Sequence, residues 1–479
     1  MRLRHRQATP SGSVLIIVLW VAFGLVAITL YFGNTMIFEF RAADNRVAGL
    51  AAEQAIEGAA RYVNYLLLNL GTNGMVPDPT TYSRDAVPVG EAHFWFIGRD
   101  NNSQIKTNTP TFALVDEASK LNLNTVGLTN LQWLPNITPE FAAAIVDWRD
   151  TDTTVSDGGA EAPTYASLQP PYLCKDTNFE SVDELRLVYG ATMDLLIGED
   201  ENRNGVLDDN EFDANGNKQA DPGILEYVTV FSREPNTRTN GAARVNPSNQ
   251  QQLDSLLQTA LGAARAAQIR ARLDAAGLLA AGPRPASSGG SSGGNTRSTG
   301  GTAAAAAAAA AMVTTYASPL QFYVRSGMTV DEFAQIANDI TVTNGAFITG
   351  RVNVNTASAV VLACLPGLTA DLAQQLISYR QANPDLLTSI GWVVEALGQN
   401  NAATIQALGT VDCITTQSYQ FTADIAAVGP HGRGYRRVRF VFDTVEGTPK
   451  IIYRQDLSHL GWALGKDARQ NWLAAKGTR

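Results

Sequence analysis

Residues 200–211, DENRNGVLDDNE, have the composition and spacing of a calcium-binding loop. Oxygen donors stand at the first, third, fifth, seventh, ninth and twelfth positions, which are Asp200, Asn202, Asn204, Val206 through its carbonyl, Asp208 and Glu211. Gly205 permits the sharp turn at the sixth position. Alternating oxygen donors around a glycine suit a hard cation wrapped by one tight loop. The pattern predicts a Ca²⁺ site, and an acidic, glycine-rich surface turn is the alternative interpretation.

A second acidic segment, DANGNKQAD at 213–221, follows directly and could hold a second ion. Its possible donors are Asp213, Asn215, Asn217, Gln219 and Asp221. No helix is predicted after Glu211, so the first loop lacks the paired helices of a calcium sensor. We therefore expect one or two structural calcium ions that stabilise an excursion of the chain.

The other residues capable of chemistry do not form a recognisable active site. No G-x-S-x-G, H-E-x-x-H, P-loop or dinucleotide fingerprint occurs between a predicted strand and helix. The four histidines have no metal-ligand spacing; they are His5, His93, His431 and His459. The three cysteines, Cys174, Cys364 and Cys413, lack a histidine pattern that would activate a thiol. Cys364 and Cys413 could pair in an oxidising compartment, or all three could be buried and reduced. The sequence predicts a protein that is not an enzyme.

Composition narrows the class of protein further. The chain has 479 residues, of which 45% are hydrophobic, enough for an anchor and two or three domains. Its net charge of −9 argues against a general nucleic-acid binder, because such proteins neutralise phosphates with Lys and Arg. We expect no nucleic-acid partner.

The element that must position everything else is the uncharged run at 13–32, SVLIIVLWVAFGLVAITLYF. A helix of this length crosses the roughly 30 Å hydrocarbon layer. Arg2, Arg4 and Arg6 precede it and would hold the amino end in the cytoplasm, so the rest of the chain faces outward. A cleaved signal peptide, which has a shorter apolar part, and a plain signal anchor are the alternatives.

The helical pattern continues over 39–70, where apolar residues from Val47 to Leu70 recur at three- and four-residue spacing. One apolar face of this helix needs a sheet to cover it. Alternation predicts strands at 93–98, 111–116, 419–428, 435–442 and 450–454. The strands at 419–428 and 435–442 should form an antiparallel hairpin with one covered face.

The segment between these strands contains an internal repeat. KLNLNT at 120–125 recurs as RVNVNT at 351–356, and LPNITPEFAAAIVDWR at 134–149 recurs as LPGLTADLAQQLISYR at 365–380. Each copy predicts an extended Asn-x-Asn segment, a helix, a tight Leu-Pro turn and a second helix. The turn resembles helix-hairpin-helix units, but it is poor in Lys and Arg, which favours a structural or protein-binding role over DNA binding. Asn122, Asn124, Asn353 and Asn355 are expected to satisfy backbone groups.

Other predicted elements are helical segments at 178–199 and 251–279 and a strand at 224–231. A weaker third copy, RVNPSN at 244–249, precedes the second helical segment. Residues 282–311 are low in complexity, with Gly and Ser followed by an alanine run, and we expect a disordered insertion there.

The amino-terminal segment resembles a type IV prepilin leader, in which a short basic peptide ends at a glycine before a long apolar helix. By this resemblance a prepilin peptidase cuts between Gly12 and Ser13. The helix then serves as membrane anchor and later as the packing core of a filament. Ordinary members carry glutamate at the fifth mature position, where this chain has Ile17. Because an unpaired carboxylate is costly in a dry bundle, Ile17 suits a subunit that caps a filament.

The chain as a whole resembles the K-type minor pseudopilins of the type II (general) secretion pathway. The order of features carries the resemblance: the leader without glutamate, VDEASKLNLNT at 115–125, DWRD at 147–150, ESVDELRLVYG at 180–190, the acidic loop, and NVNTAS at 353–358 before LPGL. It implies an α+β fold of the type IV pilin kind, with a long amino-terminal helix on an antiparallel sheet. A large α-helical domain with helix-hairpin-helix-like repeats is inserted into that fold.

The implied domain order is a leader at 1–12, a membrane and filament-core helix at 13–33, the first pilin-like part at 34–120, the inserted helical domain at 121–410 and the carboxy-terminal sheet at 411–479. The calcium segment at 200–221 and the insertion at 282–311 lie within the helical domain.

The resemblance also implies calcium, and assembly with I- and J-type minor pseudopilins and the major pseudopilin. The location is the inner membrane of a Gram-negative-type bacterium, crossed once, with the bulk in the periplasm. The role is a filament tip that nucleates or caps a pseudopilus exporting folded proteins. A type IV pilus minor pilin for adhesion or DNA uptake is the alternative. A membrane-anchored calcium-dependent hydrolase is a third class, and it would need an active site.

Overall fold

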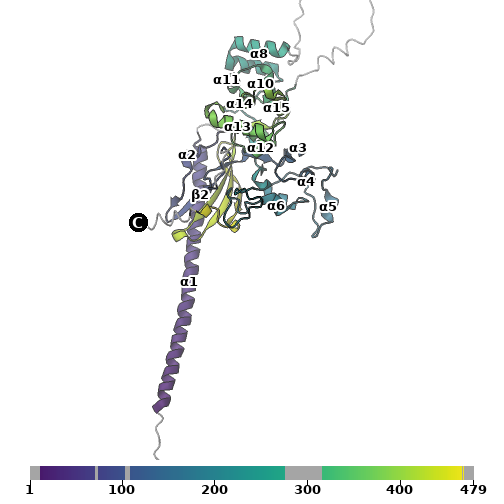
Figure 1. Ribbon diagram of the computed structural model, residues 1–479. Coiled ribbons are helices and arrows are strands. Elements are labelled where there is room, and N and C mark those ends of the chain that lie inside the picture. Colours follow the sequence, from purple (N-terminus) through teal and green to yellow (C-terminus); the bar gives the residue numbers. More distant parts are fainter. Residues whose placement is uncertain (1–10, 71–73, 103–107, 276–314, 467, 469–479) are drawn as a thin grey trace, which may run out of the picture.

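The computed structural model describes residues 11–70, 74–102, 108–275, 315–466 and 468. The first helix, α1 (Ser11–Leu68), runs unbroken through the apolar segment and beyond it. Figure 1 shows its amino-terminal part as a rod that extends away from the rest of the molecule. Side chains from Val14 to Val47 are exposed, and burial begins at Ala48. The prediction that Val47 and Leu50 join the covered face was wrong, because the sheet meets the helix on its other side there.

The carboxy-terminal part of α1 packs on an antiparallel sheet with strand order β1-β2-β10-β11-β12, in which β3 also pairs with β10. The strands are β1 (Val87–Val89), β2 (Ala92–Ile97), β3 (Val115–Asp116), β10 (Gln420–Val428), β11 (Arg436–Asp443) and β12 (Lys450–Asp456). The predicted hairpin is confirmed by the antiparallel pairing of β10 with β11, and the added strand by β12. Of the predicted strand at 111–116, only β3 and a single bridge at Phe112 form.

One apolar layer joins α1 to the sheet, as alternation along the strands predicts. It is contributed by small and aliphatic residues of the helix and by aromatic residues of the strands: Ala52, Ala55, Ile56, Ala59, Val63, Phe94, Phe96, Phe421, Ile425, Phe440 and Phe442. The loop between β10 and β11 lies so close to α1 that a Cβ on Gly434 would come within 2.4 Å of the Ala48 carbonyl carbon. The φ of Gly434 is +68°, so glycine is needed there for two reasons.

The opposite face of the sheet is also covered, which corrects the prediction of a single covered face. Every residue of β10 is buried. Trp95, Ile97, Ala426 and Val428 pack there against Ala463 and Leu464, while polar residues of the same face contact the acidic loop. One face of β10 is apolar, and the other mixes small, polar and charged residues. The second face therefore looks like a solvent-exposed face in the sequence, although it is buried.

The segment between β3 and β10 is mainly helical and has one continuous core. Its helices of five or more residues are α4 (Pro139–Arg149), α5 (Ala162–Ala166), η2 (Val182–Leu187), α6 (Met193–Ile197), α7 (Gln250–Leu261), α8 (Ala263–Ala275), α10 (Pro319–Ser326), α11 (Val330–Ala334), α12 (Ala359–Ala363), α13 (Ala370–Ala382), α14 (Gly391–Leu397) and α15 (Ala402–Gly409). Shorter elements of this segment include α3 (Leu128–Leu131), η1 (Glu117–Ser119), η3 (Ile224–Glu226), β4 (Leu121–Asn122), β5 (Val228–Thr229), β6 (Arg233–Pro235), β7 (Phe347–Thr349), β8 (Val352–Asn353) and β9 (Ile414–Thr415). The short helix α2 (Pro79–Tyr82) precedes β1.

Three predicted elements are shorter or different in type. The helix at 251–279 is broken between α7 and α8 by Gly262, whose φ is +82°. The helical segment at 178–199 consists of η2 and α6, separated at Gly190. The strand at 224–231 is a 3₁₀ turn followed by two paired residues, because Ile224 and Leu225 fill the core as a turn. The insertion at 282–311 and most of the leader lie outside the described residues.

The two sequence repeats fold alike and make the same internal contacts. In the first copy β4 pairs in parallel with β5, and in the second β8 pairs in parallel with β9. The Arg149 guanidinium donates to the carbonyls of Leu123 and Val126. Arg380 donates to the equivalent carbonyls of Val354 and Ala357, at 2.9 and 2.8 Å. The duplication therefore preserves an internal hydrogen-bond pattern.

Arg380 is 3% exposed and also donates to the Asn101 carbonyl at 2.7 Å. Replacing it by Ala leaves three buried carbonyls without this donor, so we expect the free energy of unfolding to fall by about 3 kcal/mol. Lys cannot reproduce the forked geometry, so Arg380→Lys should recover less than half of the loss. Urea titration of the detergent-solubilised chain measures both, and an unchanged midpoint in Arg380→Ala would contradict the assignment.

The repeats are joined to the sheet through Asp116, the last residue of β3. Its carboxylate accepts hydrogen bonds from Asn353 Nδ2 at 3.2 Å, Thr356 Oγ1 at 2.5 Å and the Ala118 amide at 2.8 Å. Burial raises the pKa of Asp116 to about 6, despite these hydrogen bonds. The junction between sheet and helical segment therefore contains a buried acid.

The raised pKa gives a prediction with a definite sign. The unfolded chain releases this proton near pH 4 and the folded chain near pH 6, so the folded state binds more protons between these values. The contribution of Asp116 to stability is greatest below pH 4 and declines as the pH rises through 6. Relative to wild type, Asp116→Asn should therefore gain about 2–3 kcal/mol between pH 4 and pH 7. Paired urea titrations at both pH values measure this difference; a gap independent of pH would contradict it.

Candidate metal centre

The predicted loop at 200–211 follows α6 and brings its oxygen-bearing side chains together. Asp200 is 1% exposed, and its carboxylate accepts from the amides of Asn204 at 2.9 Å and Gly205 at 2.7 Å. Arg203 and Gly205 both have positive φ, of 58° and 86°. These turns wrap the backbone around the Asp200 carboxylate, as the sequence pattern predicts for a tight loop.

The remaining predicted ligands meet at Asp208. The side-chain amides of Asn202 and Asn204 lie 2.6 and 2.9 Å from the same oxygen, Oδ2 of Asp208. Glu211 closes the loop, accepting from the amides of Asn202 at 3.1 Å and Asp208 at 2.9 Å. Burial raises the pKa of Glu211 to about 7, against the effect of these two hydrogen bonds.

These residues fit a hard cation. They supply carboxylate and amide groups from alternate positions of one loop, which is the donor set that Ca²⁺ takes. The Oδ1 atom of Asn202 is buried and has no hydrogen-bond partner, which is unusual for a buried polar atom, and a bound cation would give it one. Asp200, Asn202, Asn204, Asp208 and Glu211 would hold the ion through side chains, and Val206 through its carbonyl.

The second acidic segment has the same internal geometry, displaced by thirteen residues. Asn215 and Asn217 lie 2.6 and 2.9 Å from Oδ2 of Asp221, the same two distances as in the first loop. Asp213 accepts from the amides of Gly216 and Lys218. Gln219 takes part through its backbone amide, which donates to the side chain of Asn217. The side chain of Gln219 is not part of this hydrogen-bond pattern. Both segments therefore adopt the conformation of one motif.

Glu199 takes the place of Glu211 in the second loop, and sequence reasoning missed it. Its carboxylate accepts from the amides of Ala214 at 2.8 Å and Asp221 at 3.2 Å. It precedes the first loop, so a template that places the bidentate carboxylate at the twelfth position does not find it. The pairing of residues 198 and 222 brings the start and the end of the double loop together, which places Glu199 beside the second site.

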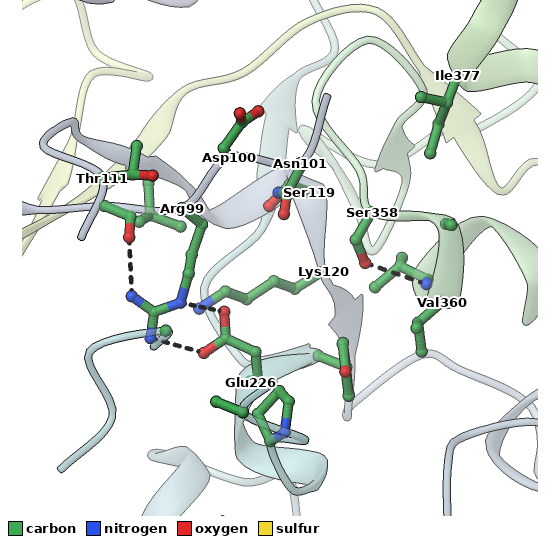
Figure 2. Close-up of a pocket in the computed structure, with 18 of the residues that line it drawn as sticks. Arg99, Asp100, Asn101, Thr111, Ser119, Lys120, Glu226, Ser358, Val360 and Ile377 are labelled. Carbon is green, nitrogen blue, oxygen red and sulfur yellow. Dashed lines mark hydrogen bonds and ion pairs between the residues drawn. The ribbon is translucent and has the colours of Figure 1, made fainter. Parts of the chain in front are cut away.

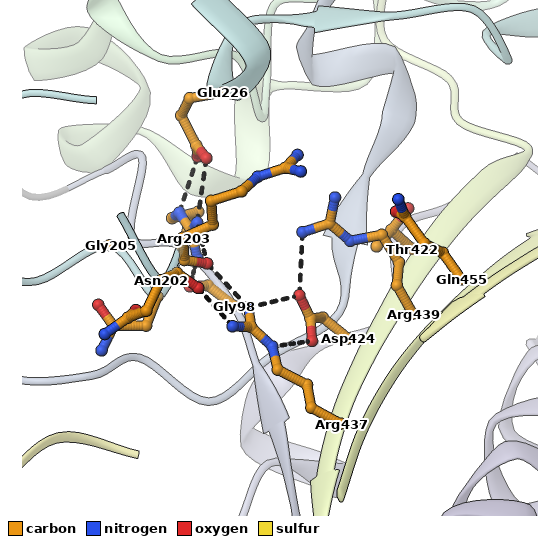
Figure 3. Close-up of polar contacts among 12 residues, drawn as sticks. Gly98, Asn202, Arg203, Gly205, Glu226, Thr422, Asp424, Arg437, Arg439 and Gln455 are labelled. Carbon is orange, nitrogen blue, oxygen red and sulfur yellow. Dashed lines mark hydrogen bonds and ion pairs between the residues drawn. The ribbon is translucent and has the colours of Figure 1, made fainter. Parts of the chain in front are cut away.

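The first loop docks on the sheet through a buried charge network (Figure 3). Arg437 on β11 is fully buried; it forms a two-pronged ion pair with Asp424 on β10, with both N···O distances 2.8 Å. The same guanidinium donates to the loop carbonyls of Asn202 at 2.5 Å and Arg203 at 2.9 Å. Burial would raise the pKa of Asp424, but Arg437 and Arg439 reverse this effect and hold it well below its usual range.

A polar pocket lies beside this network, between the sheet and the helical segment (Figure 2). Arg99 forms an ion pair with Glu226, at 2.7 and 3.0 Å, and donates to the Arg203 carbonyl at 3.0 Å. The two serines of the pocket have structural partners: Ser119 donates to the Asp116 carbonyl and Ser358 accepts from the amide of Val361. Arg99 of this pocket therefore holds the acidic loop in place. Among the described residues, neither serine hydroxyl is paired with a base that could activate it.

The cysteines are all unpaired, so the Cys364–Cys413 disulfide does not form in this structure. Burial raises the pKa of the Cys174 and Cys364 thiols to about 12, which disfavours a reactive thiolate. The asparagines of the repeats bind backbone as predicted: Asn124 donates to the Phe179 carbonyl and Asn355 to the Leu387 carbonyl. Gly12 and Ser13 lie within the backbone of α1.

Among the described residues, one helix is long and apolar enough to cross a membrane, and it is the amino-terminal part of α1. The fold is therefore a mixture of helix and sheet, in which a duplicated helical unit lies between the strands of an antiparallel sheet. The apolar part of α1, which runs onto this sheet, fits a membrane anchor that crosses the bilayer once.

Comparison with known proteins matches two parts of this chain to one family. The family described as "Type II secretion system (T2SS), protein K" matches residues 119–196 and 352–410, which contain the two repeats. Type II secretion system protein K of Aeromonas hydrophila is 29% identical over 205 residues, covering 38% of this chain and 60% of that protein. The protein of the same name from Pectobacterium carotovorum subsp. carotovorum is 41% identical over 56 residues, or 12% of this chain and 17% of that protein. Two separate parts of this chain and both relatives therefore point to the same family, type II secretion system protein K.

The aligned regions thus span less than two thirds of either relative. Among solved structures, a chain of the GspK-GspI-GspJ complex from the enterotoxigenic Escherichia coli Type 2 Secretion System is similar at a TM-score of 0.37 and 10% identity. That comparison covers 89% of this chain and 98% of the solved chain.

Proposed function

We propose that this chain is a minor pseudopilin that forms the tip of a type II secretion pseudopilus, where it nucleates or caps assembly with I- and J-type minor pseudopilins. The observation that carries the proposal is the two-part character of α1. Its side chains are exposed over the apolar part, from Val14 to Phe40, and from Ala48 onward one face of the helix is buried on the sheet. A rod with this distribution can sit in lipid first and pack among similar helices afterwards.

The position of the helical segment supports a capping role. It lies beside the sheet and at the end of the molecule opposite the free part of α1 (Figure 1). A subunit stacked above would have to occupy the volume of α8, α10 and α13. Ile17, which is 60% exposed in the isolated chain, offers no carboxylate to pair with a neighbouring amino terminus. Both features suit a subunit that others do not extend.

The structural role of calcium belongs to this proposal. One or two ions, held at 200–211 and 213–221, would stiffen the double loop that Arg437 and Arg99 attach to the sheet. When bound, the ion supplies positive charge among clustered carboxylates and cross-links loop positions. The protein acts as a structural component, with a prepilin peptidase as its processing enzyme and the inner membrane as its first location.

Processing after Gly12 is the first test. In a host with prepilin peptidase, amino-terminal sequencing of the membrane-extracted chain should begin at Ser13. Loss of the peptidase gene should leave residues 1–12 attached. A mature terminus elsewhere would contradict the pilin-type anchor.

Assembly and export form the second test. A tagged chain should co-purify with two other minor pseudopilins, and deletion of its gene should abolish export of the folded substrates of the system. The type IV pilus alternative predicts normal secretion with lost adhesion or DNA uptake. Normal secretion in the deletion strain would overturn the proposal.

A further inference from the structure

A second group of carboxylates, separate from the double loop, lies between the end of α4 and the segment at 174–176. It contains Asp147, Asp150 and Asp152 at the end of α4, Glu161 at the start of α5, and Asp176. Ligand atoms of Asp150, Asp152 and Glu161 all lie within 4.8 Å of one another, and so do those of Glu161, Cys174 and Asp176. Glu161 is common to both sets and marks the centre of the cluster.

Glu161 distinguishes this cluster from an ordinary acidic surface. It is 0% exposed, and both of its carboxylate oxygens are buried without a hydrogen-bond partner. It stands at the N-cap position of α5, yet its side chain makes no capping hydrogen bond. Asp150 Oδ1 and Asp176 Oδ1 are likewise buried and without a partner. Four unsatisfied carboxylate oxygens in one place are rare in folded proteins and carry a large desolvation penalty.

Nearby basic side chains are engaged elsewhere. Arg149 donates to the carbonyls of Leu123 and Val126, and Lys175 pairs with Glu184 at 2.7 Å. In the described part of the chain no salt bridge reaches Asp150, Glu161 or Asp176. The Asp147 carboxylate accepts from a single backbone amide, that of Ser156, which lies 3.3 and 3.2 Å from its two oxygens. Arg149 offsets only part of the repulsion within the group, through its charge near Asp150.

We propose that Asp150, Asp152, Glu161 and Asp176 bind a divalent calcium ion that ties the loop at 150–161 to the segment at 174–176. Oxygen donors from two chain segments, with a central carboxylate free to bind through both oxygens, are the set that Ca²⁺ takes. Zn²⁺ would favour the Cys174 thiolate. Cys174 is the one sulfur donor among these oxygen donors, and a set made mainly of carboxylates favours the harder cation.

A calcium site at Glu161 and a buried acid without a metal lead to different expected melting temperatures. Glu161→Gln removes the central charge, so in EGTA the variant should melt above wild type, because repulsion is relieved. In millimolar calcium the order should reverse, because wild type gains an ion that the variant cannot hold. Asp157→Asn changes an exposed acid of the same loop and should match wild type in both conditions.

The decisive measurement is the number of calcium ions bound per full-length chain in detergent, from equilibrium dialysis with calcium alone. Glu161→Gln and Asp150→Asn should each bind one ion fewer than wild type and Asp157→Asn. Combining Glu161→Gln with Glu211→Gln should remove ions additively, which separates this site from the loop at 200–211. Equal ion counts in Glu161→Gln and wild type would overturn the proposal. Zinc retained in place of calcium, and lost in Cys174→Ser, would overturn the choice of metal.

Discussion

Replacing Arg437 by Met is expected to lower the free energy of unfolding by about 3–5 kcal/mol, because it leaves the buried Asp424 carboxylate short of its main partner. Arg439 remains at 3.0 Å from Asp424 and compensates only in part. The substitution also removes the donor that holds the carbonyls of Asn202 and Arg203. Sheet and acidic loop are therefore weakened by the same change.

Urea titration of the detergent-solubilised chain measures this loss. Arg436→Met provides the matched control, because Arg436 is the neighbouring residue on β11 and is exposed. Its variant should stay within about 0.5 kcal/mol of wild type. A loss below about 1 kcal/mol in Arg437→Met would show that the buried pair does not organise the junction.

Calcium is expected to raise the melting temperature by several degrees, and Glu211→Gln should remove most of that gain. A ligand present at about 100 times its dissociation constant stabilises the folded state by about 2.7 kcal/mol. In the proposed site Glu211 would supply two oxygens at the twelfth position, so its amide variant would lack the bidentate carboxylate on which calcium binding is expected to depend. Thermal melting in EGTA and in 1–2 mM calcium, roughly physiological for an extracellular-type site, measures the difference.

Glu201→Gln is the control for this prediction. Glu201 lies in the same loop, is exposed, and occupies the second position, to which the calcium-loop pattern assigns no ligand. The calcium-dependent gain should persist in Glu201→Gln. Equal gains in Glu211→Gln and wild type would remove the loop at 200–211 from the metal sites.

Together these contacts explain how three parts of the chain form one unit. The α1 helix is attached to the sheet by an apolar layer, the helical segment is attached through Asp116, and the double loop is attached through Arg437 and Arg99. If the chain acts as the filament subunit proposed above, weakening these junctions should impair assembly first. Cations at the acidic sites would stabilise the head without touching the helix.

The sequence alone determined the features that depend on local pattern. The length and apolarity of the first helix, the β10–β11 hairpin and the two repeats follow from periodicity, because residues three, four or two apart share a face. The first acidic loop was found by its donor spacing, since all its ligands lie within twelve consecutive residues. The family followed from the order of these features.

Tertiary structure decided the features that join distant residues. Glu199 takes part in the second loop because the ends of the double loop pair, and Glu161 meets Asp176 because the segment at 174–176 returns to the start of α5. The second face of the sheet is buried because the acidic loop docks on Arg437. None of these contacts has a signature in the spacing of neighbouring residues. They depend on which surfaces the folded chain brings together, and on the cost of leaving a buried charge unpaired.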